Sequence, residues 1–110
     1  MTIYNLCMNE FEDRVYGIAR LIPKGKVASY GQLAEMAGYP RMARAAGRAM
    51  RNGPSDEDIP YHRVVNKSGD LAPGHVFGGK ERQRMILESE GIVFRSNGRI
   101  DMKKCIWKPD

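Results

Sequence analysis

The stretch Ile59–Val65 places a histidine between a phenol and a guanidinium. His62 could accept the proton of the Tyr61 hydroxyl and so make the phenol a nucleophile. An ordinary phenol has a pKa of about 10, so on the order of 0.1% is ionised at neutral pH, and it is a weaker nucleophile than a thiol. Three interpretations of Tyr61 stay open from these residues: a nucleophile, the wall of a binding site, or the polar start of a buried strand.

A second group of residues could bind an anionic polymer. Arginines recur at spacings of three, four and three, which predicts one basic stripe on a helix: Arg41, Arg44, Arg48 and Arg51. Small residues lie between them, and these let a bulky surface approach the helix while arginines reach phosphates: Ala43, Ala45, Ala46, Gly47 and Ala49. The pattern favours a helix in a nucleic-acid groove. The alternative is a solvated basic face opposite a packing face.

Composition bounds the class of protein. The 110 residues, 42% of them hydrophobic, fit a single domain over residues 1–110. No apolar run approaches the roughly 18 residues of a membrane span, and the start of the chain lacks a signal-peptide pattern. We therefore expect a cytoplasmic monomer without a membrane partner. Neither Cys7 nor Cys105 belongs to a CxxC or a Cys/His cluster, so no metal and no cofactor are predicted.

Three helices are predicted in the first half of the chain. Apolar residues at helical spacing predict a helix over residues 9–22 with Asn9 as its N-cap. Ser29 and Gln32 form a capping box that begins a short helix ending at Gly38. A third helix over residues 41–51 should have Pro40 in its first turn.

The second half combines extended segments, a turn and another helix. Residues 59–65 should be extended, residues 66–70 should turn, and a helix over residues 79–90 should bury Gln83, Met85 and Ile86. Asn97-Gly98 predicts a β-hairpin. The fold class that follows is mainly α: a winged-helix-like helix-turn-helix domain with a small β-hairpin.

Several motifs over residues 9–94 together resemble the DNA-binding domain of the alkylguanine-DNA alkyltransferases: Ile22–Ala34, Ala43–Gly47, Pro60–Val65, Ser68-Gly69, Gly78-Gly79 and Glu90-Gly91. The enzymes of that family carry Pro-Cys-His-Arg, in which the cysteine accepts the alkyl group from guanine O6. Tyr61 occupies the position of that cysteine. The resemblance is therefore to the alkyltransferase-like proteins, which lack the acceptor. The N-terminal domain of many of the enzymes is also absent from these residues.

The resemblance implies a helix-turn-helix that enters the minor groove and flips the damaged nucleotide. Arg44 would fill the gap in the duplex, and Tyr30 would crowd the 3′ phosphate. The implied DNA-binding residues are Arg44, Tyr30, Ala43, Ala45, Gly47, Arg48 and Arg51. The implied lesion pocket comprises Tyr61, Tyr30, Val64, Val76 and Gly78. Flipping costs a few kcal/mol, and less for a base that pairs badly.

The resemblance also implies a vestigial proton relay. His62, Glu90 and Asn52 match its members, and no catalytic residue is predicted. A buried His62–Glu90 pair can instead brace two loops by hydrogen bonding. Arg63 is expected to fix its own segment, and Trp107 to pack on the core.

The resulting hypothesis is a non-enzymatic sensor of O6-alkylguanine in double-stranded DNA that directs lesions to nucleotide excision repair proteins. Such a protein would be nucleoid-associated when bound to DNA. Two alternatives stay open: a suicidal alkyltransferase that uses Tyr61 or a thiol, and a winged-helix transcriptional regulator.

Overall fold

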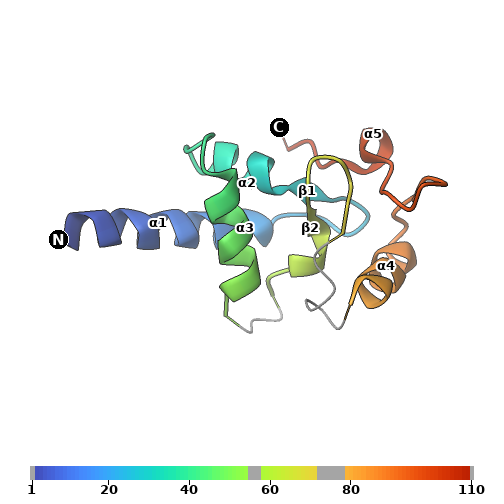
Figure 1. The fold of residues 1–110 in the computed structure, drawn as a ribbon, viewed down its shortest axis with the longest axis horizontal. Helices are drawn as coiled ribbons and strands as arrows, with labels where there is room; N and C mark the ends of the chain where they lie inside the picture. The colour runs from blue at the N-terminus through green and yellow to red at the C-terminus, as the bar shows by residue number, and fades with distance from the viewer. Residues whose placement is uncertain (1, 55–57, 72–78, 110) are drawn as a thin grey trace.

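The computed structural model describes residues 2–54, 58–71 and 79–109, with side chains from residue 10 onward. Figure 1 shows the first helices of the chain at one end of the molecule, the last helices at the other, and a short sheet between them. In chain order the elements are α1 (Thr2–Ala19), β1 (Ala28–Ser29), α2 (Tyr30–Met36), α3 (Ala43–Asn52), the 3₁₀ turn η1 (Tyr61–Arg63), β2 (Val64–Val65), α4 (Lys80–Ser89) and α5 (Met102–Cys105).

α1 packs along one face because its apolar residues recur every four positions. Phe11, Val15 and Ala19 are all buried. The helix begins at Thr2 and ends at Ala19, so both predicted ends are wrong. Its C-terminal end tightens into three-residue hydrogen bonds, in which Leu21 and Ile22 donate to carbonyls three positions back. This tightening ends the regular helix before Pro23.

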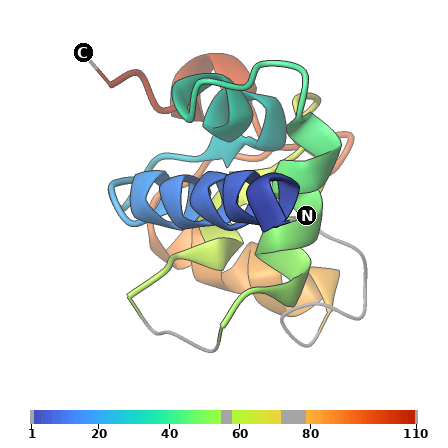
Figure 2. The same ribbon diagram turned by 90° about the vertical axis from the view of Figure 1, so that its left-hand side faces the viewer.

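α2 and α3 form the predicted helix-turn-helix. The Ser29 side chain accepts from the backbone N–H of Gln32, and the Gln32 side chain accepts from the Ser29 N–H, which confirms the capping box. Gly38 has φ 95° and supplies the turn, a conformation that side-chain-bearing residues rarely adopt. α3 begins at Ala43, so Pro40 lies in the turn and the predicted start of this helix is wrong. Figure 2 shows α2 above α1 and α3 beside it.

The central sheet is parallel and brings distant segments together. Ala28 pairs with Val64, and Ser29 pairs with Val65. The extended prediction for residues 59–65 is correct at its end but wrong at residues 61–63, which form η1. The sheet therefore joins the residue before α2 to the residues that follow η1.

The predicted hairpin is shorter than expected. Its turn forms, since Arg95 N donates to Arg99 O at 2.7 Å, but Phe94 and Ile100 make a single antiparallel bridge. The extended segment ends after Ile100 because Asp101 caps α5 by accepting from the Lys104 N–H. Among the described residues, the wing is thus a turn with one bridge.

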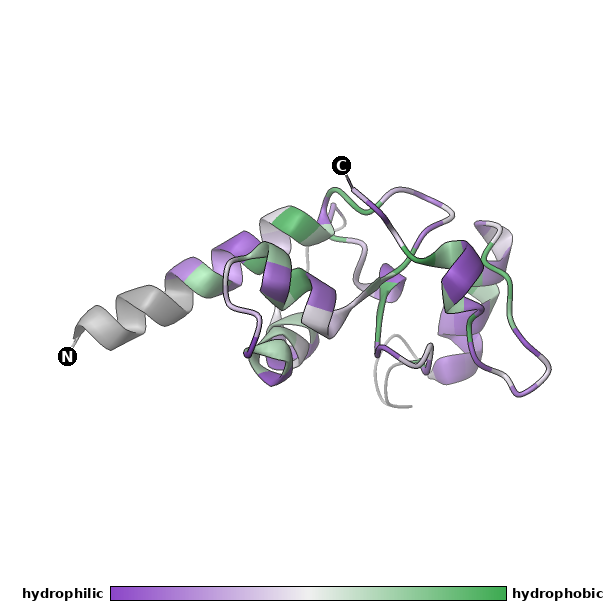
Figure 3. Cartoon of the chain, turned by 90° about the horizontal axis from the view of Figure 1, so that it is seen from above, coloured by the Kyte–Doolittle hydropathy of each residue, from purple (hydrophilic) through white to green (hydrophobic). Residues whose placement is uncertain are grey.

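Two apolar clusters lie on either side of the sheet. The first is built mainly from α1, α2 and α3, and the second from Val27, Val65, α4 and the C-terminal segment. Trp107 packs on the first cluster, as predicted. Figure 3 shows hydrophilic and hydrophobic residues on both α3 and α4, consistent with one face of each packing inward. No helix among the described residues could cross a membrane.

α4 buries residues four positions apart. Gln83 and Leu87 are completely buried, whereas Met85 is 69% exposed. The predicted burial of Gln83 is confirmed, whereas the predicted burial of Met85 is wrong. The buried face of α4 contains residues 83 and 87, and residue 85 points away from it. The Gln83 side-chain N–H donates to the His62 carbonyl at 3.0 Å, so this buried amide links α4 to η1.

Candidate nucleic-acid interface

α3 turns its arginines outward and its small residues inward. Arg44, Arg48 and Arg51 are exposed on the helix, while Ala46 and Ala49 are buried. Arg41 lies in the turn before the helix, so the predicted stripe has three helical arginines. The helix presents a basic outer face on an apolar base.

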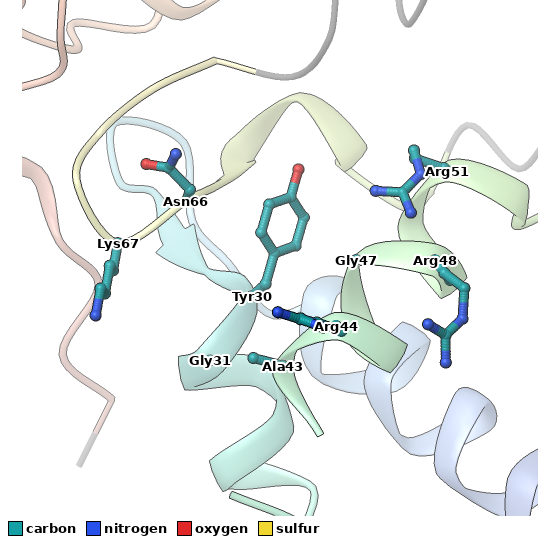
Figure 4. A pocket seen from close by; sticks show the side chains of 9 residues that line it. All are labelled: Tyr30, Gly31, Ala43, Arg44, Gly47, Arg48, Arg51, Asn66 and Lys67. Carbon is teal, nitrogen blue, oxygen red and sulfur yellow. The ribbon is translucent and has the colours of Figure 1, made fainter. Parts of the chain in front are cut away.

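These arginines border a hollow of about 440 Å³ between α3, the start of α2 and the loop after β2 (Figure 4). We call it the arginine hollow. Four of its nine lining residues are cationic and none carries a carboxylate, which favours an anionic ligand. The lining residues are Tyr30, Gly31, Ala43, Arg44, Gly47, Arg48, Arg51, Asn66 and Lys67.

Small residues keep the arginine hollow open. A Cβ on Gly47 would stand 3.6 Å from Arg51 Nη1 and 3.9 Å from Tyr30 Cδ1, which are ordinary contacts. A Cβ on Gly31 would meet nothing nearer than the Ala43 Cβ at 3.9 Å. The protein therefore does not need glycine at either position for its own packing. Their lack of side chains instead lets a large partner approach the backbone closely.

Tyr30 is the aromatic member of the arginine hollow. It is the first residue of α2, directly after the Ser29 cap, and Figure 4 shows its ring rising between α3 and the loop that carries Asn66. Burial raises the pKa of the Tyr30 phenol, and the nearby Arg51 charge opposes this only in part. The phenol is therefore neutral at physiological pH and can donate a hydrogen bond to a phosphate oxygen.

A second polar cluster joins η1 to the end of α4. His62 Nε2 lies 2.9 Å from Glu90 Oε2. Arg63 binds the same carboxylate in a bidentate manner, since its Nε donates to Oε1 and its Nη2 donates to Oε2, both at 2.9 Å. Its Nη1 donates to the Ile22 carbonyl at 2.9 Å. The predicted His62–Glu90 pair and the fixing role of Arg63 are thus seen in the structure.

The charge state of Glu90 follows from these contacts. Burial alone would raise the pKa of its carboxyl group, but the hydrogen bonds and charges of Arg63 and His62 outweigh burial and hold the pKa below its ordinary value. Glu90 is therefore ionised at neutral pH. An ionised carboxylate with a bidentate arginine is a strong structural clamp.

Tyr61 lies outside the lining of the arginine hollow. Its hydroxyl donates to the Pro54 carbonyl at 2.7 Å, and its ring packs on the first apolar cluster. A Cβ on Gly53 would overlap the Tyr61 hydroxyl and approach Ala49 O to 2.9 Å. The glycine is needed there for space, and the phenol ties the chain after α3 to η1.

Residues 10–92 match the family model of the 6-O-methylguanine DNA methyltransferase, DNA binding domain. The chain belongs to this family. It is 38% identical to the DNA base-flipping protein of Vibrio parahaemolyticus over 93% of this chain and 100% of that protein. It is 34% identical to alkyltransferase-like protein 1 of Schizosaccharomyces pombe over 93% of this chain and 98% of that protein. The predicted resemblance is confirmed.

Solved structures agree with this family. The structure of S. pombe Atl1 in complex with damaged DNA containing O6-carboxymethylguanine matches with a TM-score of 0.78 at 35% identity, over 92% of this chain and 97% of that one. Mycobacterium tuberculosis OGT in complex with DNA matches with a TM-score of 0.66 at 40% identity, over 74% of this chain and 48% of that one. The chain thus corresponds to about half of that methyltransferase.

Most of the predicted DNA-binding residues line the arginine hollow, and one packs in the first apolar cluster. Five of the predicted DNA-binding side chains and Gly47 line the arginine hollow together: Tyr30, Ala43, Arg44, Gly47, Arg48 and Arg51. Ala45 is only 7% exposed and packs in the first cluster. The Ala45 side chain therefore faces inward, and a DNA contact at residue 45 stays a prediction.

The predicted lesion pocket is described only in part. Val64 is buried in β2, so only its backbone is suited to contact a base. Val76 and Gly78 lie outside the described residues. Asn52 is exposed at the end of α3, and within the described ranges its side chain makes no hydrogen bond to His62 or Glu90. The structure thus joins His62 to Glu90, and a place for Asn52 beside them stays a prediction.

The structure adds Gly31, Asn66 and Lys67 to the site. The capping box already indicated that Gly31 lies in the first turn of α2. The turn at residues 66–70 was also predictable, and Asn66 Oδ1 accepts from Ser68 N and Asp70 N at 2.9 Å. Only the parallel pairing of β1 with β2 reveals that this turn lies beside Tyr30.

Proposed function

We propose that this protein is a non-enzymatic sensor that binds O6-alkylguanine in duplex DNA. Its α3 enters the minor groove, and the damaged nucleotide is flipped out of the duplex. The observation that carries the proposal is the arginine hollow, where three exposed arginines and a neutral tyrosine surround a floor of small residues. Arginines provide the charge for phosphates, and the small residues allow the close approach that a groove requires.

Nucleotide flipping assigns separate roles to Arg44 and Tyr30. Arg44 fills the space left in the duplex, because a planar guanidinium can replace part of the lost stacking and hydrogen bonding. Tyr30 donates to a phosphate and crowds the backbone next to the lesion. Tyr61, the backbone of Val64, Val76 and Gly78 would form the pocket for the flipped base. The similarity to a protein solved with alkylated DNA supports these roles.

The contacts of Tyr61 and Glu90 favour binding of the alkylated base without transfer of its alkyl group to the protein. The Tyr61 hydroxyl already donates a hydrogen bond to the Pro54 carbonyl. Glu90 is held by both nitrogens of the Arg63 fork as well as by His62. These contacts fix η1 against α4. A tyrosine hydroxyl is also a weaker nucleophile than a thiol.

The cellular role is part of the same proposal. The protein would act as a cytoplasmic monomer that associates with the nucleoid when bound to DNA. It would direct lesions to nucleotide excision repair proteins. Nucleotide flipping supports this role, because a protein that extrudes and holds a base without repairing it marks the site for another pathway.

The first experiment is a titration of two duplexes that differ only in O6-methylguanine. Wild-type protein should bind the damaged duplex more tightly, and equal affinity for both would refute the sensor. Arg44→Ala should lose about 5–150-fold in affinity for the damaged duplex, equivalent to about 1–3 kcal/mol. Arg82→Ala is the matched control, since Arg82 is an exposed arginine on α4 outside the arginine hollow.

Intact mass spectrometry tests the absence of chemistry. After incubation with the damaged duplex, the protein should keep its mass, because the flipped base is held and not dealkylated. A stoichiometric methyl increment would show that the protein is an alkyltransferase. Tandem mass spectrometry would then identify the alkylated residue.

A further inference from the structure

The C-terminal segment is fixed beside the start of α2. The Val27 N–H donates to the Cys105 carbonyl at 2.9 Å, and the Trp107 N–H donates to the Val27 carbonyl at 2.7 Å. The Gln32 side chain donates to the Trp107 carbonyl at 2.8 Å. Gln32 belongs to the capping box of α2, so one helical turn positions both this segment and Tyr30.

A second hollow, of about 660 Å³, opens beside this fixed segment. We call it the tail hollow. Half of its lining side chains are lysines and none is a carboxylate, and Lys103 and Lys108 are exposed to solvent. The nearby Asp101 is occupied as the cap of α5. The lining residues are Ser29, Lys67, Met102, Lys103, Ile106 and Lys108.

Lys67 connects the tail hollow with the arginine hollow, because it lines both of them. The two linings together contain six cationic side chains and no acidic one. A small anion would need only one of these hollows. A continuous track of positive charge instead matches a polymer with regularly spaced phosphates.

We propose that the tail hollow is a second site for the DNA backbone, where Lys103 and Lys108 hold phosphates beyond those at the arginine hollow. This rests on the proposed function only in that the arginine hollow binds duplex DNA. Lysine provides a flexible point charge, which holds a phosphate without reading the base sequence. The tail hollow therefore increases affinity for damaged and undamaged duplexes alike and leaves the preference for damage to the arginine hollow.

The test is the salt dependence of binding by a Lys103→Ala/Lys108→Ala double variant. Each lost phosphate contact lowers the slope of log affinity against log salt by about 0.9, so the slope should fall by about 1.8. A tenfold rise in salt should then weaken wild-type binding about 60-fold more than variant binding. The slope should fall by the same amount for duplexes with and without O6-methylguanine. The ratio of the affinities for these two duplexes should therefore be the same in the variant as in the wild type.

The matched control is a Lys24→Ala/Lys80→Ala double variant, which removes the same charge from two exposed lysines outside both hollows. Its slope should equal that of the wild type, and unchanged melting temperatures would show that both double variants fold. The proposal is overturned if the Lys103/Lys108 variant has the same slope as this control. If wild-type protein shows no preference for damage but the slope still falls, the sensor function fails and the tail site stands.

Discussion

Replacing Gly47 with alanine should make the free protein more stable and its DNA binding weaker. Gly47 lies in the interior of α3 and lines the arginine hollow. Alanine is the better helix former, because glycine loses more backbone entropy on folding. The added methyl group would lie on the surface that we propose meets the DNA. Stability and affinity should therefore change in opposite directions.

The magnitude follows from the surroundings of residue 47. A Cβ there meets Arg51 Nη1 at 3.6 Å and Tyr30 Cδ1 at 3.9 Å, so no strain offsets the gain in helix propensity. Gly47→Ala should raise the free energy of unfolding by about 0.5–1 kcal/mol. In the complex, an extra methyl group in a close-packed interface costs about 1–3 kcal/mol. The dissociation constant should therefore rise by about 5–150-fold.

The assay combines urea unfolding with fluorescence anisotropy on a labelled duplex. Gly17→Ala is the matched control, because Gly17 lies within α1 and a Cβ there has nothing within 4 Å. It should gain a similar amount of stability and bind DNA as the wild type does. Comparing the two variants separates the effect of helix propensity from the effect of the interface.

Two results would refute the reasoning. If Gly47→Ala binds both damaged and undamaged duplexes with wild-type affinity, this face of α3 does not enter the groove. If the variant is less stable than the wild type, the contacts around residue 47 are tighter than the structure indicates. The control excludes a general effect of replacing glycine in a helix.

Two further substitutions test the cluster around η1. Glu90→Gln removes the charged partner of Arg63 and His62 and should lower the free energy of unfolding by about 3 kcal/mol at neutral pH. Because the folded-state pKa of Glu90 lies below its ordinary value of 4.5, its stabilisation is complete above that pH and is lost as the pH falls through the folded pKa. The difference between variant and wild type should narrow on acidification, and a constant difference from pH 7 to pH 3 would contradict this. Tyr61→Phe removes the hydrogen bond to Pro54 and should lower stability by about 1 kcal/mol while the preference for O6-methylguanine persists; loss of that preference would show that the hydroxyl itself contacts the lesion.

The helices and the basic face of α3 could be predicted because their signals are local. The capping box of Ser29 and Gln32 depends on residues three positions apart, and it is present as predicted. The arginine spacing also survives from Arg44 to Arg51. Helix ends were less predictable, since α1 ends by tightening its hydrogen bonds and α3 starts only after the turn containing Arg41.

Long-range contacts explain what the sequence did not reveal. No local pattern indicates that Val64 pairs in parallel with Ala28, and this pairing places Asn66 and Lys67 next to Tyr30. The position of the C-terminal segment likewise depends on a bond between Gln32 and Trp107, which are 75 residues apart. Each of these contacts joins segments that only the folded chain brings together.

The segment from Tyr61 to Lys67 gives the contacts of His62 and Arg63 with Glu90 a structural role. His62 and Arg63 tie η1 to Glu90 and therefore fix the start of β2. β2 then pairs with β1, and the next residues, Asn66 and Lys67, line the arginine hollow. A sheet register can shift only in whole residues. Fixing the start of β2 therefore determines where the residues after β2 lie. The contacts with Glu90 thus help to position Asn66 and Lys67 in the arginine hollow, and this role requires no catalysis.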